Sequence, residues 1–461
     1  MQSDQSSPPR GGVDVVALMD SMSVGAFHLR VLAICVVIAM LDGFDTQAIA
    51  FIAPVVSAAW KVPMSQFSAA FGVGLLGLTV GALVLGPVAD RVGRKLVLIA
   101  CTAAFGLFAL ATAWAQDFQS LLWLRFLTGV GLGGAMPNII AMTAEYAPQR
   151  LRATAVTVMF CGFPLGSVLG GFLAAKMIPA WGWESVFILG GILPLVTVPF
   201  LFALLPESVR FLVSHHRHPE RVAAIMAHLT GDAATHRADT PYFVPEQKIT
   251  GFTGRQLFTE HRAGLTLLLW VAFFCNLLVM YFLVNWLPAL LKQTGYPLDA
   301  AIYATSTLNF GGVVGGVVLG RLIDRMGPFA ILGACYAAAA GFIVVTAHAA
   351  GSSAILYGSL FIVGIGVVGA QIGMNAVASS LYPTGLRATG IGWALGIGRL
   401  GSILGPTVGG ILLAGGWAPN AILQVSAWPA LIAAIAVFIL GRVVARRDRK
   451  LAEGATVVAG V

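Results

Sequence analysis

Twelve apolar runs of about twenty residues or more limit the fold of this chain more than any other feature. A helix of about 20 residues crosses a hydrocarbon core of roughly 30 Å, and it satisfies its own backbone hydrogen bonds there. The chain is 58% hydrophobic and 10% charged, whereas soluble domains carry about 25% charged residues. The sequence therefore predicts an all-α integral membrane protein with twelve transmembrane helices, at 30–55, 66–89, 96–115, 120–143, 153–175, 184–205, 264–290, 299–322, 329–348, 353–378, 388–413 and 420–441.

Lys and Arg are unevenly distributed between the two sets of loops. Cytoplasmic loops of membrane proteins carry an excess of these residues. Most of the 27 Lys and Arg residues lie in the set that includes both chain ends, whereas the opposite loops hold Lys61, Lys176 and Lys292. We therefore expect a multi-pass protein of the cell inner (cytoplasmic) membrane with both termini cytoplasmic. Residues 1–28 lack a basic start and a cleavage site, so no signal peptide is expected.

Two stretches occur twice in the same order. LGPVADRVGRK (85–95) matches LGRLIDRMGP (319–328), and LRATAVTVMFCGFPLGSVLGG (151–171) matches LRATGIGWALGIGRLGSILGP (386–406). The chain is therefore a duplicated unit of six spans, and an even number of spans gives both copies the same orientation. We expect two six-helix bundles related by a parallel repeat. The expected domains are a cytoplasmic N-terminal segment (1–29), an N-terminal bundle (30–205), a cytoplasmic connector (206–263), a C-terminal bundle (264–441) and a basic cytoplasmic tail (442–461).

Several motifs carry a resemblance to a known family. GPVADRVGRK (86–95), RFLTGVGLGG (125–134), LPESVRFL (205–212) and GSILGPTVGG (401–410) together resemble the major facilitator superfamily over essentially the whole chain. LDGFDTQ (41–47) and EYAPQRLRAT (145–154) resemble, more narrowly, the aromatic acid:proton symporter family. The resemblance implies a secondary active transporter that works by alternating access, with the first, fourth, seventh and tenth spans lining a central cavity.

Four ionisable side chains lie well inside the predicted spans: Asp42, Asp45, Arg125 and Arg399. Each costs at least roughly 2.5–3.5 kcal/mol to insert, so such residues usually face a cavity or a partner. Asp42 and Asp45 are three residues apart and share one helix face. From the helix rise, Asp45 and Arg125 both lie about 8 Å from the outer end of the core, and Asp42 and Arg399 lie about 16–18 Å from its cytoplasmic end.

We interpret Asp42 and Asp45 as proton-coupling residues, and Arg125 and Arg399 as substrate-binding residues. A guanidinium binds either an aspartate or a substrate carboxylate in bidentate fashion. Protonation of Asp45 would therefore release Arg125 to hold an organic acid anion. The alternative is a permanent pair of Asp45 and Arg125 that only orders helix packing. Arg399 has a structural alternative too, because carbonyls freed at the GSILGPTVGG bend can accept its hydrogen bonds.

An aromatic substrate needs apolar walls with a few polar groups. Side chains on the cavity-type spans provide both, and the candidates for substrate contact are Phe44, Asn276, Tyr281, Gln371 and Asn375. Trp286, near the outer end of its span, either lines the cavity or belongs to the aromatic belt at the membrane surface.

The charged turns between spans predict a gate. In the superfamily, such residues form charge pairs that close the cytoplasmic side in one state and break in the other. Positive-inside topology explains part of these charges, and the second copy departs from the motif because Pro328 stands where the first has Arg94. In LPESVRFL, we expect Pro206 to end a helix and Glu207 to begin another. The expected gating residues are Asp90, Arg91, Gly93, Arg94, Glu145, Arg152, Asp324, Arg325 and Arg387.

The leading hypothesis is a proton symporter that imports aromatic (benzoate-type) or related organic acids. The alternative is a proton-coupled exporter of drugs or metabolites, because CGFPLGSVLGG (161–171) resembles a motif of such antiporters. An enzyme is disfavoured, since the sequence has no nucleophile triad, metal-ligand set or phosphate-binding loop, and the five cysteines lie in the spans without metal spacing. We expect a monomer in the lipid bilayer that binds a small organic acid anion, with the proton as coupling ion and no cofactor, metal or nucleic acid.

Overall fold

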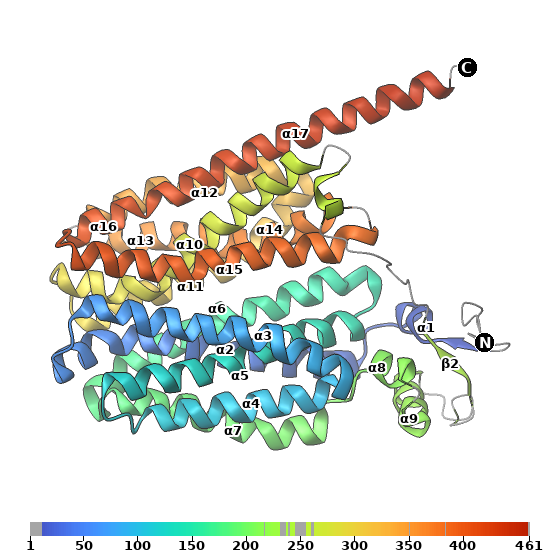
Figure 1. Cartoon of the computed structure of the whole chain (residues 1–461), viewed down its shortest axis with the longest axis horizontal. Helices are drawn as coiled ribbons and strands as arrows, with labels where there is room; N and C mark the ends of the chain where they lie inside the picture. Colours follow the sequence, from blue (N-terminus) through green and yellow to red (C-terminus); the bar gives the residue numbers. More distant parts are fainter. Residues whose placement is uncertain are drawn as a thin grey trace. The chain divides into compact units, whose positions relative to one another are not determined.

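The computed structural model describes residues 12–215, 217–230, 237, 240–244, 255–259, 262–349, 351–382 and 384–459. Within these residues, twelve helical stretches are long and apolar enough to cross a membrane (Figure 1). The prediction of twelve spans is confirmed. Most helices extend beyond their apolar runs: α2 covers Ala26–Trp60, whereas its run covers 30–55, because helical hydrogen bonding continues past the hydrocarbon core. The protein is therefore a multi-pass membrane protein.

The twelve spans form two six-helix bundles that follow the sequence duplication. The first six are α2 (Ala26–Trp60), α3 (Phe67–Val92), α4 (Arg94–Thr112), α5 (Phe118–Tyr146), α6 (Arg152–Trp181) and α7 (Glu184–Leu204). The second six begin with α10 (Ala263–Gln293), α11 (Leu298–Met326) and α12 (Pro328–Ala347). The tenth span consists of three consecutive elements: α13 (Ser353–Gly364), η4 (Ile365–Gly369) and α14 (Ala370–Leu381). The eleventh span is α15 (Thr384–Ala414), and the last consists of α16 (Pro419–Val425) and α17 (Ala427–Ala459).

The tenth span contains a short π-helical segment, η4. Glycines bring this segment against α11: a Cβ added to Gly364 or Gly311 would collide with the backbone of the other helix, and Gly315 and Gly369 face each other in the same way. The extra residue of a π turn rotates the following helix by about 100° relative to an unbroken α-helix. The segment therefore sets the direction in which α14 presents its polar side chains.

Small elements outside the spans were not specified by the sequence patterns. They are α1 (Val15–Ser21), α8 (Val209–Ser214), α9 (Pro219–Thr230), the short 3₁₀ turns η1 (Met64–Gln66), η2 (Gln149–Leu151) and η3 (Arg255–Phe258), and a parallel pair of two-residue strands. The strands are β1 (Val13–Asp14) and β2 (Tyr242–Phe243), which join the start of the described chain to its central connector. Asp14 caps α1 by accepting hydrogen bonds from Val16 and Ala17.

Residue contacts divide the chain into two compact units whose borders cross helices α2, α3, α6 and α7. Unit 1 comprises Met1–Gly43, Leu76–Phe163 and Phe187–Ile249, and unit 2 comprises Phe44–Leu75, Pro164–Val186 and Thr250–Val461. A buried cluster that includes Ile38, Leu98 and Ile139 forms the core of unit 1. In unit 2, the corresponding core includes Phe273, Tyr336 and Met374.

Within unit 2, the second half of α2 and the first half of α3 pack against α10, α11 and α15. The Gln47 Nε2 donates to the carbonyl oxygen of Val284 at 2.6 Å, and Asn309 Nδ2 lies 3.5 Å from Gln47 Oε1. Trp286 is completely buried; its indole donates to the carbonyl of Pro406 at 2.8 Å, and its ring centroid lies 5.4 Å from that of Phe71. Trp286 therefore packs inside unit 2 rather than in a surface belt.

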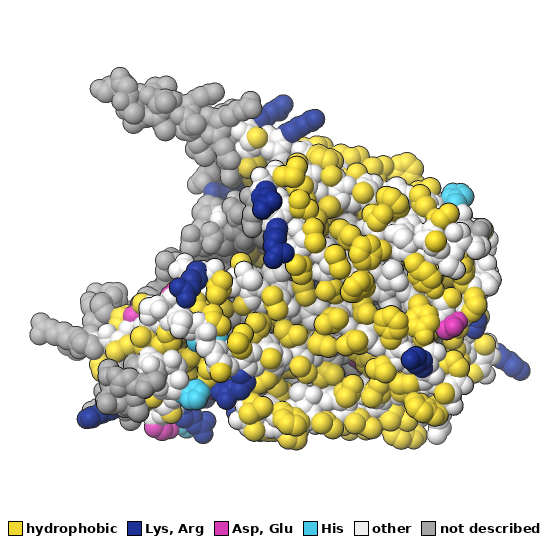
Figure 2. Space-filling model, turned by 180° about the vertical axis from the view of Figure 1, so that it is seen from behind, with side chains coloured by type: hydrophobic (Ala, Val, Ile, Leu, Met, Phe, Trp, Pro, Cys, Tyr) yellow, Lys and Arg dark blue, Asp and Glu magenta, His cyan; other side chains and the backbone are white. Residues whose placement is uncertain are grey.

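The helix surfaces are apolar. Figure 2 shows hydrophobic side chains over most of the face that it draws, with Lys and Arg in a row toward one side. Several of the largest apolar side chains are the most exposed, including Leu83, Trp181, Ile411 and Trp428. A surface of this kind fits a hydrocarbon surround, since lipid tails are as apolar as these side chains.

Candidate functional site

Three charged side chains are buried inside the first bundle. Asp42 and Asp45 of α2 are each 1% exposed, and Arg125 of α5 is 4% exposed. Each of them is engaged in at least one interaction. Asp42 and Arg125 belong to unit 1, whereas Asp45 belongs to unit 2. A direct pair of Asp45 and Arg125 therefore stays a prediction.

The two aspartates point to one side of α2 because the helix is continuous through them. At about 100° per residue, positions 42 and 45 lie about 60° apart around the helix axis. Gly43 between them faces α6, where an added Cβ would overlap the carbonyl group of Phe163. Gly43 therefore allows α2 and α6 to approach closely beside the two aspartates.

Arg125 has an aromatic neighbour of its own unit. Its guanidinium carbon lies 5.1 Å from the ring centroid of Phe187, at the start of α7. This geometry is a cation–π contact, which is worth about 2 kcal/mol when it is desolvated. A guanidinium is planar, and its N–H groups can bind a carboxylate in bidentate fashion.

The predicted aromatic contacts Phe44 and Tyr281 are both buried, at 5% and 6% exposure. The Phe44 ring lies against Gly170 of α6, where an added Cβ would overlap its edge. Phe44 therefore packs between two helices in this state. Arg399 lies on α15, is half-buried, and its carbonyl accepts a hydrogen bond from the Ser402 hydroxyl.

Three predicted polar residues of the second bundle are joined in one chain of amides. Asn276 Nδ2 of α10 donates to Gln371 Oε1 of α14, and Gln371 Nε2 donates to Asn375 Oδ1 at 3.3 Å. Asn276 is completely buried, whereas Gln371 and Asn375 are half-buried. The structure therefore brings together residues that the sequence only placed on two cavity-type spans.

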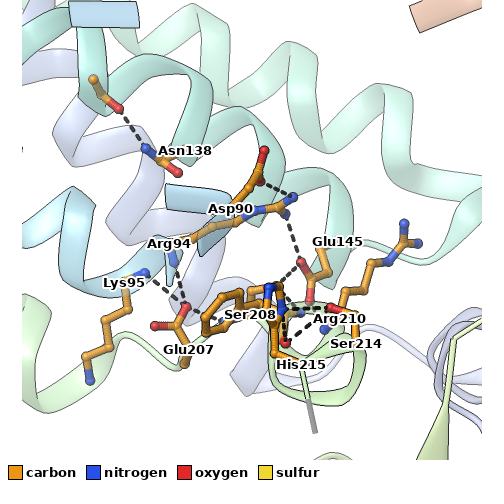
Figure 3. Close-up of polar contacts among 12 residues, drawn as sticks. Asp90, Arg94, Lys95, Asn138, Glu145, Glu207, Ser208, Arg210, Ser214 and His215 are labelled. Atoms are coloured by element: carbon orange, nitrogen blue, oxygen red, sulfur yellow. Dashed lines mark hydrogen bonds and ion pairs between the residues drawn. The ribbon is translucent and has the colours of Figure 1, made fainter. Parts of the chain in front are cut away.

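A second group of charged residues lies where the ends of α3, α4, α5 and α8 meet in unit 1 (Figure 3). Glu145 at the end of α5 accepts hydrogen bonds from Arg94 Nη1 at 3.0 Å, from the Ser208 hydroxyl at 2.7 Å and from the backbone N–H of Arg210 at 2.9 Å. Arg94 also lies 3.7 Å from the exposed carboxylate of Asp90. Charge-assisted hydrogen bonds are roughly twice as strong as neutral ones, so Glu145 links three elements firmly.

Glu207 caps helix α4 from a distant part of the chain. One carboxylate oxygen accepts the backbone N–H groups of Arg94 at 2.9 Å, Lys95 at 3.0 Å and Ser208 at 2.8 Å. Gly93, which precedes the helix, has a φ of 115° and provides no side-chain cap. The expectation that Glu207 begins a helix is wrong, because α8 begins at Val209 with Ser208 as its N-cap.

The remaining predicted gating residues are more scattered. Arg152 pairs with Asp20, 3.4 Å away, and the same carboxylate accepts the N–H of Gln149 at 2.9 Å. This contact ties α1 to the turn between α5 and α6. Arg91 and Arg325 are exposed. The side chains of Asp324 and Arg387 lie outside the part of the chain that the structure describes.

Sequence reasoning missed Glu207, Ser208, Asp20, Gln47 and Asn309 as contact residues. The motif LPESVRFL contained Glu207 and Ser208, but nothing local shows that they reach Glu145 and α4. Gln47 directly follows the two aspartates in LDGFDTQ; because it carries no charge, its position inside a span did not single it out.

Two repeated sets of six membrane helices, with buried acidic and basic side chains inside them, define a membrane transporter rather than an enzyme. The chain belongs to the Major Facilitator Superfamily, whose family model matches residues 35–406. The resemblance found in the sequence motifs is therefore confirmed.

Curated relatives and solved structures agree with this membership. The chain is 40% identical to the 4-hydroxybenzoate transporter PcaK of Pseudomonas aeruginosa over 94% of this chain and 96% of that protein. It is 40% identical to the gallate transporter of Pseudomonas putida, with the same shares of both chains covered. The xylose transporter XylE from E. coli, in a partially occluded inward open conformation, has a TM-score of 0.70 at 17% identity, covers 89% of this chain and 97% of its own, and shows the fold alone.

Proposed function

We propose that this protein imports hydroxylated or unsubstituted aromatic acids together with protons across the cytoplasmic membrane, with both termini cytoplasmic. The observation that carries the proposal is the burial of Asp42, Asp45 and Arg125 inside otherwise apolar helices. Relatives named for 4-hydroxybenzoate and gallate, and a benzoate transport protein of Acinetobacter baylyi that is 33% identical over 87% of each chain, support the substrate class.

In this proposal, Arg125 is the group that holds the substrate carboxylate. The Phe187 ring centroid lies 5.1 Å from the guanidinium carbon, and a buried cation without an anion is costly, so a carboxylate must satisfy it at each stage of the cycle. Protonation of Asp45 withdraws one such anion, and the substrate carboxylate replaces it. Proton binding and substrate binding are coupled because they change the same charge balance.

The net charge carried across the membrane in each cycle determines the direction in which the membrane potential drives transport. If two protons accompany one monoanion, each cycle carries one positive charge inward, and a membrane potential contributes about 2.3 kcal/mol per charge per 100 mV. Deprotonation at the higher internal pH restores the aspartate anion and releases the substrate. Asp42, on the same face of α2, is the second proton site.

Alternating access would use the two bundles as moving bodies, 30–205 and 264–441. The contacts of Arg94 with Asp90 and Glu145 lie within the first bundle, so they would hold its gate residues in position while neighbouring charges exchange partners. The protein acts in this scheme as a monomer with the proton as its coupling ion.

Uptake by proteoliposomes tests the proposal. Purified protein is reconstituted, and uptake of radiolabelled 4-hydroxybenzoate is measured with the outside at pH 6 and the inside at pH 7.5, then with no gradient, and then with the gradient reversed. We expect accumulation only when the outside is acidic, and loss of accumulation with a protonophore. Efflux driven by the same inward gradient would instead identify the proton-coupled exporter.

A further inference from the structure

The amide chain of Asn276, Gln371 and Asn375 has a direction. Each of the two hydrogen bonds has its donor on the earlier residue, so the chain begins with the Oδ1 of Asn276 as an acceptor. That oxygen is buried and has no hydrogen-bond partner among the described residues. An unsatisfied buried polar atom costs about 1–3 kcal/mol, and native proteins rarely leave one without a reason.

The π-helical segment fixes the position of this chain of amides. Gln371 is the second residue of α14, directly after the π-helical segment η4, and the glycines Gly364 and Gly369 hold that segment against α11. Without the extra residue of the π turn, Gln371 would point about 100° away from its present direction. The π turn therefore directs Gln371 at Asn276, and π turns often occur at functional sites.

The unsatisfied Oδ1 of Asn276, at the start of the amide chain, requires a hydrogen-bond donor. A carboxylate offers only acceptor atoms, so it cannot satisfy the Asn276 oxygen. The C–H groups of an unsubstituted ring cannot either. A phenolic hydroxyl both donates and accepts, so it can satisfy the Asn276 oxygen. The other two amides of the chain, on Gln371 and Asn375, are only half-buried.

We propose that Asn276, Gln371 and Asn375 recognise a hydroxyl group on the ring of the substrate, and that they make the transporter selective for hydroxylated aromatic acids. This inference rests on the proposed function. It assigns the ring hydroxyl of the substrate to three side chains of unit 2, where the hydroxyl completes the amide chain. The hydroxyl donates to Asn276 Oδ1, with no covalent change.

Paired substrates that differ by one hydroxyl test this assignment. Uptake of 4-hydroxybenzoate and of benzoate is measured in proteoliposomes for the wild type, Asn276→Leu and Gln371→Leu, at the same imposed pH gradient. The wild type is expected to have the lower KM for 4-hydroxybenzoate. Each variant should raise that KM by about three- to tenfold, the effect of one lost hydrogen bond, while the KM for benzoate changes less than about twofold.

The control is Asn285→Leu, which removes another buried amide from α10. Asn285 Nδ2 donates to the carbonyl of Tyr281 in its own helix, so its loss should leave the ratio of the two KM values unchanged. Gln371 is half-buried and tolerates replacement better than Asn276, so it decides the result if the Asn276 variant does not fold.

Each outcome has a distinct meaning. Equal increases in both KM values, or a wild type that does not distinguish the two acids, would overturn the recognition of the hydroxyl while leaving import of aromatic acids intact. A wild type that takes up neither acid under an acidic outside would reject the proposed function itself. A changed KM ratio in Asn285→Leu would show that any lost amide on α10 has the same effect, and it would also overturn the assignment.

Discussion

Gly93 is a single residue on which the start of α4 depends. Its φ of 115° lies in a region that side chains with a Cβ rarely adopt, and an added Cβ would come within 2.5 Å of a carboxylate oxygen of Glu207. The same carboxylate caps the helix by accepting two backbone N–H groups. The glycine thus provides both the turn and the space for a cap that comes from another element.

We therefore predict that Gly93→Ala destabilises the protein by about 2 kcal/mol or more, since strain at this φ and loss of an N-cap each cost about 1–2 kcal/mol. The midpoint of thermal unfolding in detergent would measure the change. Gly86→Ala in α3 is the matched control, because an added Cβ there meets nothing within 4 Å. Equal midpoints for the two variants would refute the explanation.

Asp45 carries the second prediction at this scale. Asp45→Asn removes the titrating group and keeps its size, so accumulation driven by a pH gradient should fall by more than about tenfold, while exchange of labelled for unlabelled substrate continues. Exchange needs no net proton movement, which separates coupling from binding. Asp117→Asn is the control, since Asp117 is an exposed N-cap for which Asn is equally suitable. Undiminished accumulation in Asp45→Asn would remove Asp45 from the mechanism.

At the scale of elements, α5 is held at its start by a capping box. Asp117 accepts the backbone N–H of Ser120 at 2.7 Å, and the Ser120 hydroxyl faces the N–H of Asp117. This helix carries Arg125 in its second turn. Two hydrogen bonds with Ser120 lower the pKa of Asp117 below its usual 3.8. The one from the Ser120 backbone has the larger effect, and the one with its side chain the smaller.

A lowered pKa in the folded state means that ionised Asp117 stabilises α5 above its unfolded-state pKa, and that this contribution disappears as the pH falls through the folded-state pKa. Asp117→Ala should therefore lower the unfolding midpoint at pH 7, and its difference from the wild type should shrink as the pH falls below about 4. Thermal unfolding in detergent across this range would measure it. A difference that stays constant down to the lowest pH would contradict the capping role.

Elements also differ in how far the sequence predicts them. The spans follow from apolar length alone, and each predicted run overlaps one of the twelve described membrane-spanning stretches, with ends that differ by a few residues. The π-helical break in the tenth span has no such signal. It depends on the approach of α11 through Gly311 and Gly315, which are far away in the sequence, so the apolar run predicts a span but not its local twist.

At the scale of the whole molecule, the motifs predicted the family and the repeat, because both can be recognised from short stretches of sequence. The candidate site was predicted only as a set of residues. Burial cost singled out Asp42, Asp45 and Arg125. The partners of Glu145 and Glu207 on other elements could not be predicted, since these hydrogen bonds join residues 51 to 113 positions apart and no local sequence pattern indicates which turns meet.

The contact of α6 with α11 in unit 2 provides a test of alternating access itself. A Cβ added to Gly171 would lie 3.4 Å from the Cβ of Ser306, close to the separation of about 3.5–4.5 Å in disulfides. The double variant Gly171→Cys with Ser306→Cys should therefore form a disulfide under mild oxidation. Because α6 belongs to the first six spans and α11 to the second six, this bond would fix the contact between the two helices.

If the two bundles must separate at this contact in every cycle, oxidation should reduce substrate uptake by more than about tenfold, and dithiothreitol should restore it. Each single cysteine variant, oxidised in the same way, is the control, because the five native cysteines are at least partly buried and are present in all samples. Formation of the bond is checked by mass spectrometry. A cross-linked protein that transports at the rate of the reduced one would mean that this contact is permanent, and that the bundles move about it rather than apart from it.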